Sequence, residues 1–155
     1  MILTGAGSSA FVGLSAENLL RYRWGIDVDT RATTDLVTSW NTILLKHADN
    51  TMISFARSGN SPESMGAIMM AEKFCGEMNH IIITCNKDGR LAKFGMGNED
   101  ALLILLTPET NDKGLSMTSS FTTMLMAAQF LAHIDDPERY EPIVKGWLLY
   151  TSDAA

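Results

Sequence analysis

The chain has 155 residues, 46% of them hydrophobic and 19% charged, which indicates one globular domain with a sizeable core. The formal net charge of −6 disfavours a surface for nucleic acid or for an anionic membrane, so we expect neither partner. No apolar run reaches the roughly 18 residues that a membrane span needs, and no basic segment opens a secretory signal. We therefore expect a cytoplasmic protein.

Apolar and amphipathic segments alternate along the chain. In order they predict a strand at 1–4, a helix at 8–24, a strand at 28–33, a helix at 38–46, a strand at 51–56, a helix at 62–78, a strand at 80–84, a helical turn at 91–94, a strand at 101–107 and a helix at 121–132. Four of the strands are almost continuously apolar, which is typical of strands buried on both faces of a parallel sheet. We predict an α/β fold, a three-layer doubly wound sheet of five parallel strands with right-handed crossovers.

Three segments rich in glycine, serine or threonine follow predicted strands. We call residues 5–9 the glycine turn, residues 58–64 the serine loop and residues 118–123 the hydroxyl segment. In doubly wound sheets, ligands bind outside the carboxyl ends of the strands, so the fold should bring the three segments together. Each also opens a predicted helix, where Ser8 or Ser9, Ser61, and Thr118 or Ser119 could serve as N-caps.

The serine loop carries the most specific signal. Pro62 and Glu63 suit the first turn of a helix, but a cap needs one hydroxyl, and the loop offers Ser58, Ser61 and Ser64 as well as Asn60. Free backbone N–H groups, the helix dipole and several hydroxyls can converge here on one anion. We therefore predict a phosphate site rather than capping alone.

The other two segments are less specific. The glycine turn could face a phosphate or serve only as a tight entry to a helix, and Ala10 stands where a dinucleotide fingerprint has its third glycine. A nicotinamide cofactor is therefore disfavoured, and we expect no cofactor. For the hydroxyl segment, capping and a third wall of the pocket are equally open.

The ionisable residues indicate no catalytic group. Glu109 and Asp112 could do acid–base work but better suit a solvated loop, and Asp35 is undecided. His80 precedes a strand, and His133 ends a helix, where a cation suits the dipole.

The potential metal ligands are also few and scattered. Cys75 and Cys85 form no CxxC pair, and His47, His80 and His133 have no partner at helical spacing. We expect no metal site, and two buried thiols in a reducing compartment, although a disulfide stays open.

Together these motifs are familiar. The glycine turn, residues 54–64, residues 84–86 and residues 117–122 resemble the sugar isomerase (SIS) domain, and most closely the tagatose-6-phosphate ketose/aldose isomerase family, also described as galactosamine-6-phosphate deaminase/isomerase. The resemblance implies a five-stranded parallel, flavodoxin-like sheet with a phosphosugar pocket. Carried over residue by residue, it implies substrate contacts from Gly7, Ser8, Ser9, Ser58, Asn60, Ser61, Ser64, Ser119 and Ser120.

The resemblance also implies a missing part. Members of this family contain two SIS domains, whereas residues 1–134 hold one, and residues 135–147 would begin a helical linker. Residues 148–155 look like a non-native tail, so we expect a fragment truncated at both ends. Nothing in it matches the catalytic groups of related isomerases, so the catalytic base is unknown and we expect the fragment to lack it.

The resemblance implies an aldose–ketose isomerase or deaminase that acts on an amino-hexose or ketohexose 6-phosphate. It would act as a homo-oligomer or paired with a second SIS domain. The alternatives are a sugar-phosphate-sensing SIS module of a regulator and a flavodoxin-like nucleotide domain.

Overall fold

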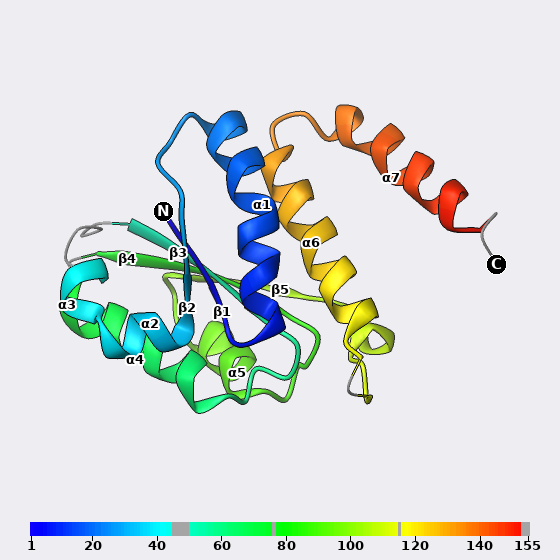
Figure 1. The fold of residues 1–155 in the computed structure, drawn as a ribbon. Coiled ribbons are helices and arrows are strands. Elements are labelled where there is room, and N and C mark those ends of the chain that lie inside the picture. Colours follow the sequence, from blue (N-terminus) through cyan, green and yellow to red (C-terminus); the bar gives the residue numbers. More distant parts are fainter. Residues whose placement is uncertain (45–49, 76, 115, 153–155) are drawn as a thin grey trace.

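The computed structural model describes residues 1–44, 50–75, 77–114 and 116–152, and it contains one five-stranded sheet (Figure 1). All four strand pairs are parallel, in the order β2-β1-β3-β4-β5. The strands are β1 (Ile2–Gly5), β2 (Asp29–Ala32), β3 (Asn50–Ala56), β4 (Met78–Thr84) and β5 (Ala101–Leu105). The predicted parallel α/β sheet is confirmed.

The strand order places a topological switch point between β1 and β3. From β1 the chain crosses outward to β2, and from β3 it crosses in the other direction to β4 and β5. The connections that leave β1 and β3 therefore diverge at the carboxyl edge and open a crevice there. The glycine turn follows β1 and the serine loop follows β3, so both segments border this crevice.

Helices cover both faces of the sheet. On one face α1 (Ser8–Trp24) and α6 (Thr118–Ala132) pack side by side over a core that includes Leu3, Ile53 and Ile83 (Figure 1). The opposite face holds a second core and is covered by α2, α4 and α5. Their bounds, with those of the remaining elements, are α2 (Thr33–Thr38), α3 (Trp40–Ile43), α4 (Pro62–Phe74), α5 (Arg90–Gly97), η2 (Pro108–Thr110) and α7 (Pro137–Ser152).

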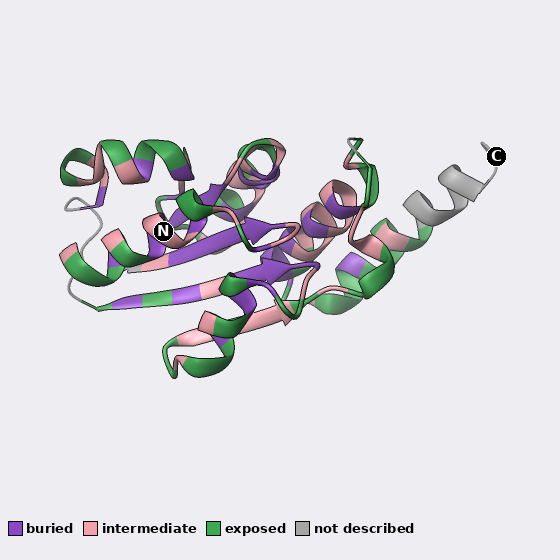
Figure 2. Cartoon of the chain, turned by 90° about the horizontal axis from the view of Figure 1, so that it is seen from below, coloured by how far each residue is buried: buried purple, intermediate pink, exposed green. Residues whose placement is uncertain are grey.

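The edge strand β5 is less buried than expected. Figure 2 shows buried residues concentrated in the middle of the sheet. In β5, which is apolar throughout, Leu102 is 53% exposed and Leu105 46% exposed. The prediction of burial on both faces is therefore wrong for β5, because a strand at the edge of a sheet has fewer helices over it.

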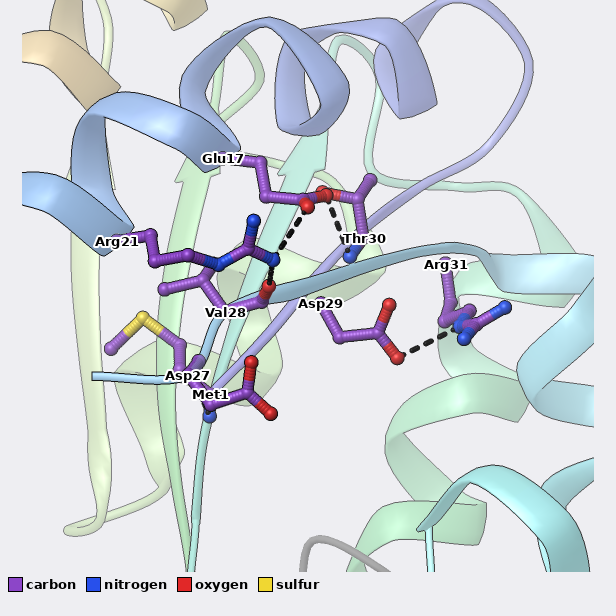
Figure 3. Close-up of polar contacts among 8 residues, drawn as sticks. All are labelled: Met1, Glu17, Arg21, Asp27, Val28, Asp29, Thr30 and Arg31. Atoms are coloured by element: carbon purple, nitrogen blue, oxygen red, sulfur yellow. Dashed lines mark hydrogen bonds and ion pairs between the residues drawn. The ribbon is translucent and has the colours of Figure 1, made fainter.

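The other edge strand, β2, is held by side chains of α1 (Figure 3). The backbone amide of Thr30 donates to Glu17 Oε2 at 3.2 Å, and Arg21 bonds both Glu17 Oε1, at 2.8 Å, and the carbonyl of Val28. These contacts satisfy the Thr30 amide of β2 and the carbonyl of Val28 just before it, which would otherwise be open to another chain. They also fix α1, whose first turn borders the crevice.

Some helix boundaries differ from the prediction. α5 spans eight residues rather than one turn, because Leu91, Ala92 and Gly95 pack into the core despite the low helix propensity of glycine. α4 ends at Phe74 instead of residue 78. α2 begins at Thr33, which the sequence predicts to be the last residue of a strand. In place of the helix predicted at 38–46, the structure has the last residue of α2 and the short helix α3. The last residues of the predicted helix lie outside the described ones.

Three expectations concern membranes, thiols and metals. No helix among the described residues has the length and apolar character that crossing a membrane requires. Cys75 and Cys85 are both buried, as predicted, and Cys75 Sγ bonds the carbonyl oxygen of Leu44. Where the structure describes the chain, no cluster of three or more histidine, cysteine or acidic side chains could hold a metal.

Candidate anion-binding site

An open hollow of about 140 Å³ lies in the crevice at the carboxyl ends of β1 and β3. The glycine turn, the first turn of α1 and the serine loop form its walls, and Met117 closes one side. Five serine side chains line it, namely Ser8, Ser9, Ser58, Ser61 and Ser64. The structure thus brings together two of the three predicted segments.

The glycine turn has a shape that requires glycine. Gly7 has a φ of 58°, in the left-handed region that side chains with a Cβ rarely adopt. A Cβ on Gly5 would lie 2.5 Å from the backbone carbon of Ser9, so the turn approaches the start of α1 too closely for another residue. Gly7 is the N-cap of α1 and no side chain caps this helix, so the predicted cap by Ser8 or Ser9 is wrong.

The serine loop is held in place by the segment that follows β4. Asn86 Nδ2 donates to the carbonyl oxygen of Ser58 at 2.9 Å, and the amide of Leu91 donates to the carbonyl of Gly59 at 3.0 Å. The side chain of Asn60 is exposed, and its Oδ1 accepts from the amide of Arg90 at 3.1 Å. The loop is therefore preorganised, and Asn60 helps to anchor it rather than line the hollow.

Ser61 and Ser64 connect the serine loop to α4. Ser61 is the N-cap of α4, as predicted, and its hydroxyl accepts from the backbone amide of Ser64 at 3.3 Å. The two hydroxyl oxygens lie 2.6 Å apart. Ser61 and Ser64 both line the hollow, so the start of α4, with the positive end of its dipole, borders it.

Arg57 supplies positive charge to this site. It follows β3, lines the hollow, and its Nη1 donates to the backbone carbonyl oxygen of Asp112. Arg57 is the one ionisable side chain among the described residues that line the hollow. A guanidinium with several hydroxyls suits the binding of an oxyanion, whereas a general base would need a group with a pKa nearer neutrality.

The hydroxyl segment is engaged differently from the serine loop. The amide and the hydroxyl of Ser120 both donate to Asp112 Oδ2 at 2.8 Å, and Ser120 is buried. These hydrogen bonds, with smaller ones from Ser119, hold the pKa of the Asp112 carboxyl below its usual value. The N-cap of α6 is Met117, without a side-chain cap bond, so the predicted cap by Thr118 or Ser119 is wrong.

The predicted site residues therefore fall into two groups. Five serines line the hollow, while Gly7 shapes the turn beside it, Asn60 anchors the serine loop, and Ser119 and Ser120 lie at the start of α6 without lining it. Sequence reasoning missed Met117 as a lining residue and left Asp112 as a solvated loop residue. Asp112 stands eight residues before Ser120, so no local capping spacing could identify it.

The remaining candidates lie elsewhere. Glu109 is exposed in η2, and Asp35 is exposed in α2. His80 lies near the amino end of β4, away from the carboxyl edge, and its Nε2 is 2.7 Å from Glu72 Oε1. His133 follows α6 as its C-cap, where the sequence placed it.

Two other hollows lack the serine-rich lining of this site. One of about 180 Å³ between α6 and α7 is lined mainly by apolar side chains, including Leu125 and Ile143. Another, of about 230 Å³, lies beyond β4 and includes the buried Cys85. Burial raises the pKa of the Cys85 thiol and keeps it protonated, which makes it a poor nucleophile.

Comparison with known families gives one match over most of the chain, the SIS domain, over residues 1–134. Among curated relatives, the D-galactosamine-6-phosphate deaminase AgaS of Escherichia coli O157:H7 is 43% identical over 125 residues, which are 81% of this chain and 33% of the relative. The AgaS deaminase of Shewanella sp. (strain ANA-3) is 38% identical over 130 residues, or 82% of this chain and 34% of the relative. The chain spans about a third of the length of these relatives.

Solved structures agree with this match. The tagatose-6-phosphate ketose/aldose isomerase from Escherichia coli superposes with a TM-score of 0.83 at 40% identity, over 86% of this chain and 36% of that one. Glucosamine-6-phosphate deaminase from Thermotoga maritima superposes with a TM-score of 0.75 over 93% of this chain and 43% of that one. Its identity is 24%, so it supports the fold alone.

Proposed function

The chain belongs to the SIS domain family, and from that premise we propose that its hollow binds the phosphate group of a hexose 6-phosphate. The observation that carries the proposal is the convergence of five serines, the start of α4 and Arg57 on one hollow at the switch point. Each hydrogen bond to the charged phosphate would contribute about 1.5–3 kcal/mol. The names of the relatives point to an amino-hexose or ketohexose 6-phosphate as the ligand.

For the whole parent protein, we propose an aldose–ketose isomerase or deaminase. The expected chemistry is opening of the sugar ring and proton transfer between C1 and C2. When C2 carries nitrogen, water then hydrolyses the resulting C2 imine to the ketone and ammonia is released. The phosphate anchor would supply binding energy and orientation to that step. The proton-transfer groups would come from a second SIS domain or a second copy of the chain, in a cytoplasmic protein.

The alternative function is a module that senses a sugar phosphate without converting it. It is favoured by the side chains in the hollow, where Arg57 is the one ionisable group among the described lining residues. Both functions require phosphosugar binding by this chain, and they differ in turnover. An isomerisation or ammonia-release assay on the complete parent protein separates them: no turnover with tight binding would favour the sensor.

Binding is tested by thermal unfolding of this chain with galactosamine 6-phosphate, tagatose 6-phosphate, inorganic phosphate or free galactose. At a ligand concentration of about 100 times Kd, a bound phosphosugar should raise the melting temperature by roughly 5–10 °C. Free galactose should have no such effect, because it lacks the anion. Equal stabilisation by galactose and the phosphosugars would contradict the proposed anchor.

A further inference from the structure

Asp112 connects the start of α6 to the opposite wall of the hollow through two different parts of the same residue. Its carboxylate accepts two hydrogen bonds from Ser120, and its backbone carbonyl oxygen accepts one from Arg57. Arg57 leaves β3 and Ser120 lies in the first turn of α6, so Asp112 joins two elements that are far apart in sequence. The connection between η2 and α6 is therefore tied to the hollow at Asp112.

The carboxylate contact fixes the residue firmly. Ser120 offers it both a backbone amide and a buried hydroxyl, each at 2.8 Å, at the positive end of the α6 dipole. Hydrogen bonds of this kind, to a charged acceptor, are stronger than those between neutral groups. With its side chain held in this way, Asp112 has little freedom to move its carbonyl away from Arg57.

The carbonyl contact acts directly on the hollow. Arg57 immediately precedes Ser58, and a guanidinium with one N–H bonded to a fixed carbonyl keeps its remaining donors for an anion. Met117 lies between Asp112 and Ser120 in the chain, lines the same hollow, and accepts a weak hydrogen bond from the Ser8 hydroxyl to its sulfur at 3.9 Å. The segment that includes the lining residue Met117 is therefore held on both sides, at Asp112 and at Ser120.

We propose that Asp112 is a positioning residue, which orients Arg57 and the Met117 wall for the phosphate of the ligand. This inference rests on the proposed function, since it assumes that the hollow binds a phosphosugar. It assigns the Asp112 carboxylate to site geometry rather than to acid–base chemistry or to a solvated loop. The inference predicts that removal of the Asp112 side chain weakens ligand binding. Charge alone predicts the opposite, because removal of a negative charge near an anion site would strengthen anion binding.

The direction of the change in affinity is therefore the test. The Kd of galactosamine 6-phosphate would be measured by calorimetry for the chain and its variants. Asp112→Ala should weaken binding about tenfold, because an Arg57 that is no longer oriented would lose a hydrogen bond to the charged phosphate. Asp112→Asn keeps one oxygen acceptor for Ser120 and should recover most of the affinity. Glu109→Ala is the matched control: it removes the same charge from an exposed position three residues away and should leave Kd within about twofold.

A double-mutant cycle tests whether Asp112 acts through Arg57. Arg57→Ala should weaken binding, and adding Asp112→Ala to it should cause little further loss, because the guanidinium that Asp112 orients is already absent. Additive losses would contradict this route. Circular dichroism of each variant checks folding. If Asp112→Ala does not fold, Ser120→Ala, which removes one of the two hydrogen bonds to the Asp112 carboxylate, takes its place in the cycle.

The outcomes separate this inference from the proposed function. If the unmodified chain does not bind the phosphosugar, the proposed function fails, and the inference fails with it. If the unmodified chain binds and Asp112→Ala binds equally well or more tightly, the inference alone is overturned. Weaker binding by Asp112→Ala, recovery by Asp112→Asn and unchanged binding by Glu109→Ala would support it.

Discussion

The starts of α4 and α6 have similar sequences but different surroundings. Both are rich in hydroxyls and both follow a connection from the carboxyl edge of the sheet. At α4 the cap is Ser61, a neutral local side chain, and the hydroxyls of Ser61 and Ser64 face a hollow. At α6 the partner is Asp112, a carboxylate from the preceding connection, and Ser120 is buried against it.

The comparison shows when a hydroxyl-rich helix start can receive an anion from outside. Both helix ends attract negative charge, but the positive end of α6 is already supplied with a carboxylate from within the chain. In the described part of the chain, no carboxylate is hydrogen-bonded to the start of α4, and Glu63 in its first turn is exposed. We therefore assign the ligand phosphate to the serine loop and assign the α6 start to the support of the site.

The largest effect should come from giving α4 an internal anion like that of α6. Ser61→Asp keeps a good N-cap for α4, so the fold should persist, but a carboxylate would stand where the phosphate is proposed to bind. Like charges in contact cost several kcal/mol, so phosphosugar affinity should fall by on the order of 100-fold in calorimetry. Thr34→Asp, in the exposed first turn of α2, is the control for added charge. Retained affinity in Ser61→Asp would break the comparison.

A smaller effect is expected when the hydroxyl is removed without adding charge. Ser61→Ala should weaken phosphosugar binding about tenfold and lower the free energy of unfolding by about 1 kcal/mol, because both the ligand contact and the α4 cap are lost. Thr123→Ala is its partner on α6, where the hydroxyl donates to the carbonyl of Ser119 at 2.7 Å. Thr123→Ala should change Kd less. Equal losses in the two variants would contradict the assignment of the phosphate to α4.

The smallest effect concerns pH and the α6 start. Hydrogen bonds from Ser120 lower the pKa of the Asp112 carboxyl in the folded chain below its usual value of 3.8. The stabilisation by this carboxylate is therefore complete above that value, and it is lost as the pH falls through the lower pKa of the folded state. Denaturant unfolding should give a difference between the chain and Asp112→Asn that is constant near neutral pH and shrinks in strong acid. A difference that changes around neutrality would show that another group is responsible.

The sequence was sufficient to predict features that depend on residues close together in the chain. Nearly continuous apolar runs located four strands, alternation of β-branched residues located β2, and Ser61 next to Pro62 identified the N-cap of α4. It could not predict the exposure of Leu102, because that depends on where β5 lies in the sheet. α5 was underestimated because its glycines have low helix propensity, while packing of Leu91 against the sheet stabilises it.

In the candidate site, too, features set by adjacent residues were predictable and contacts between residues distant in sequence were not. The serine loop was found because its hydroxyls are adjacent in sequence, and the fold brings it to the glycine turn as the parallel topology predicts. The partnership of Asp112 with Ser120 and Arg57 was not predictable, since it depends on the path of the connection between η2 and α6. Sequence patterns indicate that a helix start can bind an anion, and three-dimensional contacts decide whether one is already present.

The central claim, that the serine loop and glycine turn hold the phosphate of a sugar phosphate, is tested most directly by amide chemical-shift mapping. ¹⁵N-labelled chain would be titrated with galactosamine 6-phosphate, with free galactose as the control. We predict the largest shifts at the amides of Ser8, Ser58 and Gly59, which line the hollow, a small shift at Ser120, whose amide is bonded to Asp112, and no matching response to galactose. Shifts centred on the hollow between α6 and α7, or the same shifts with galactose, would contradict the claim.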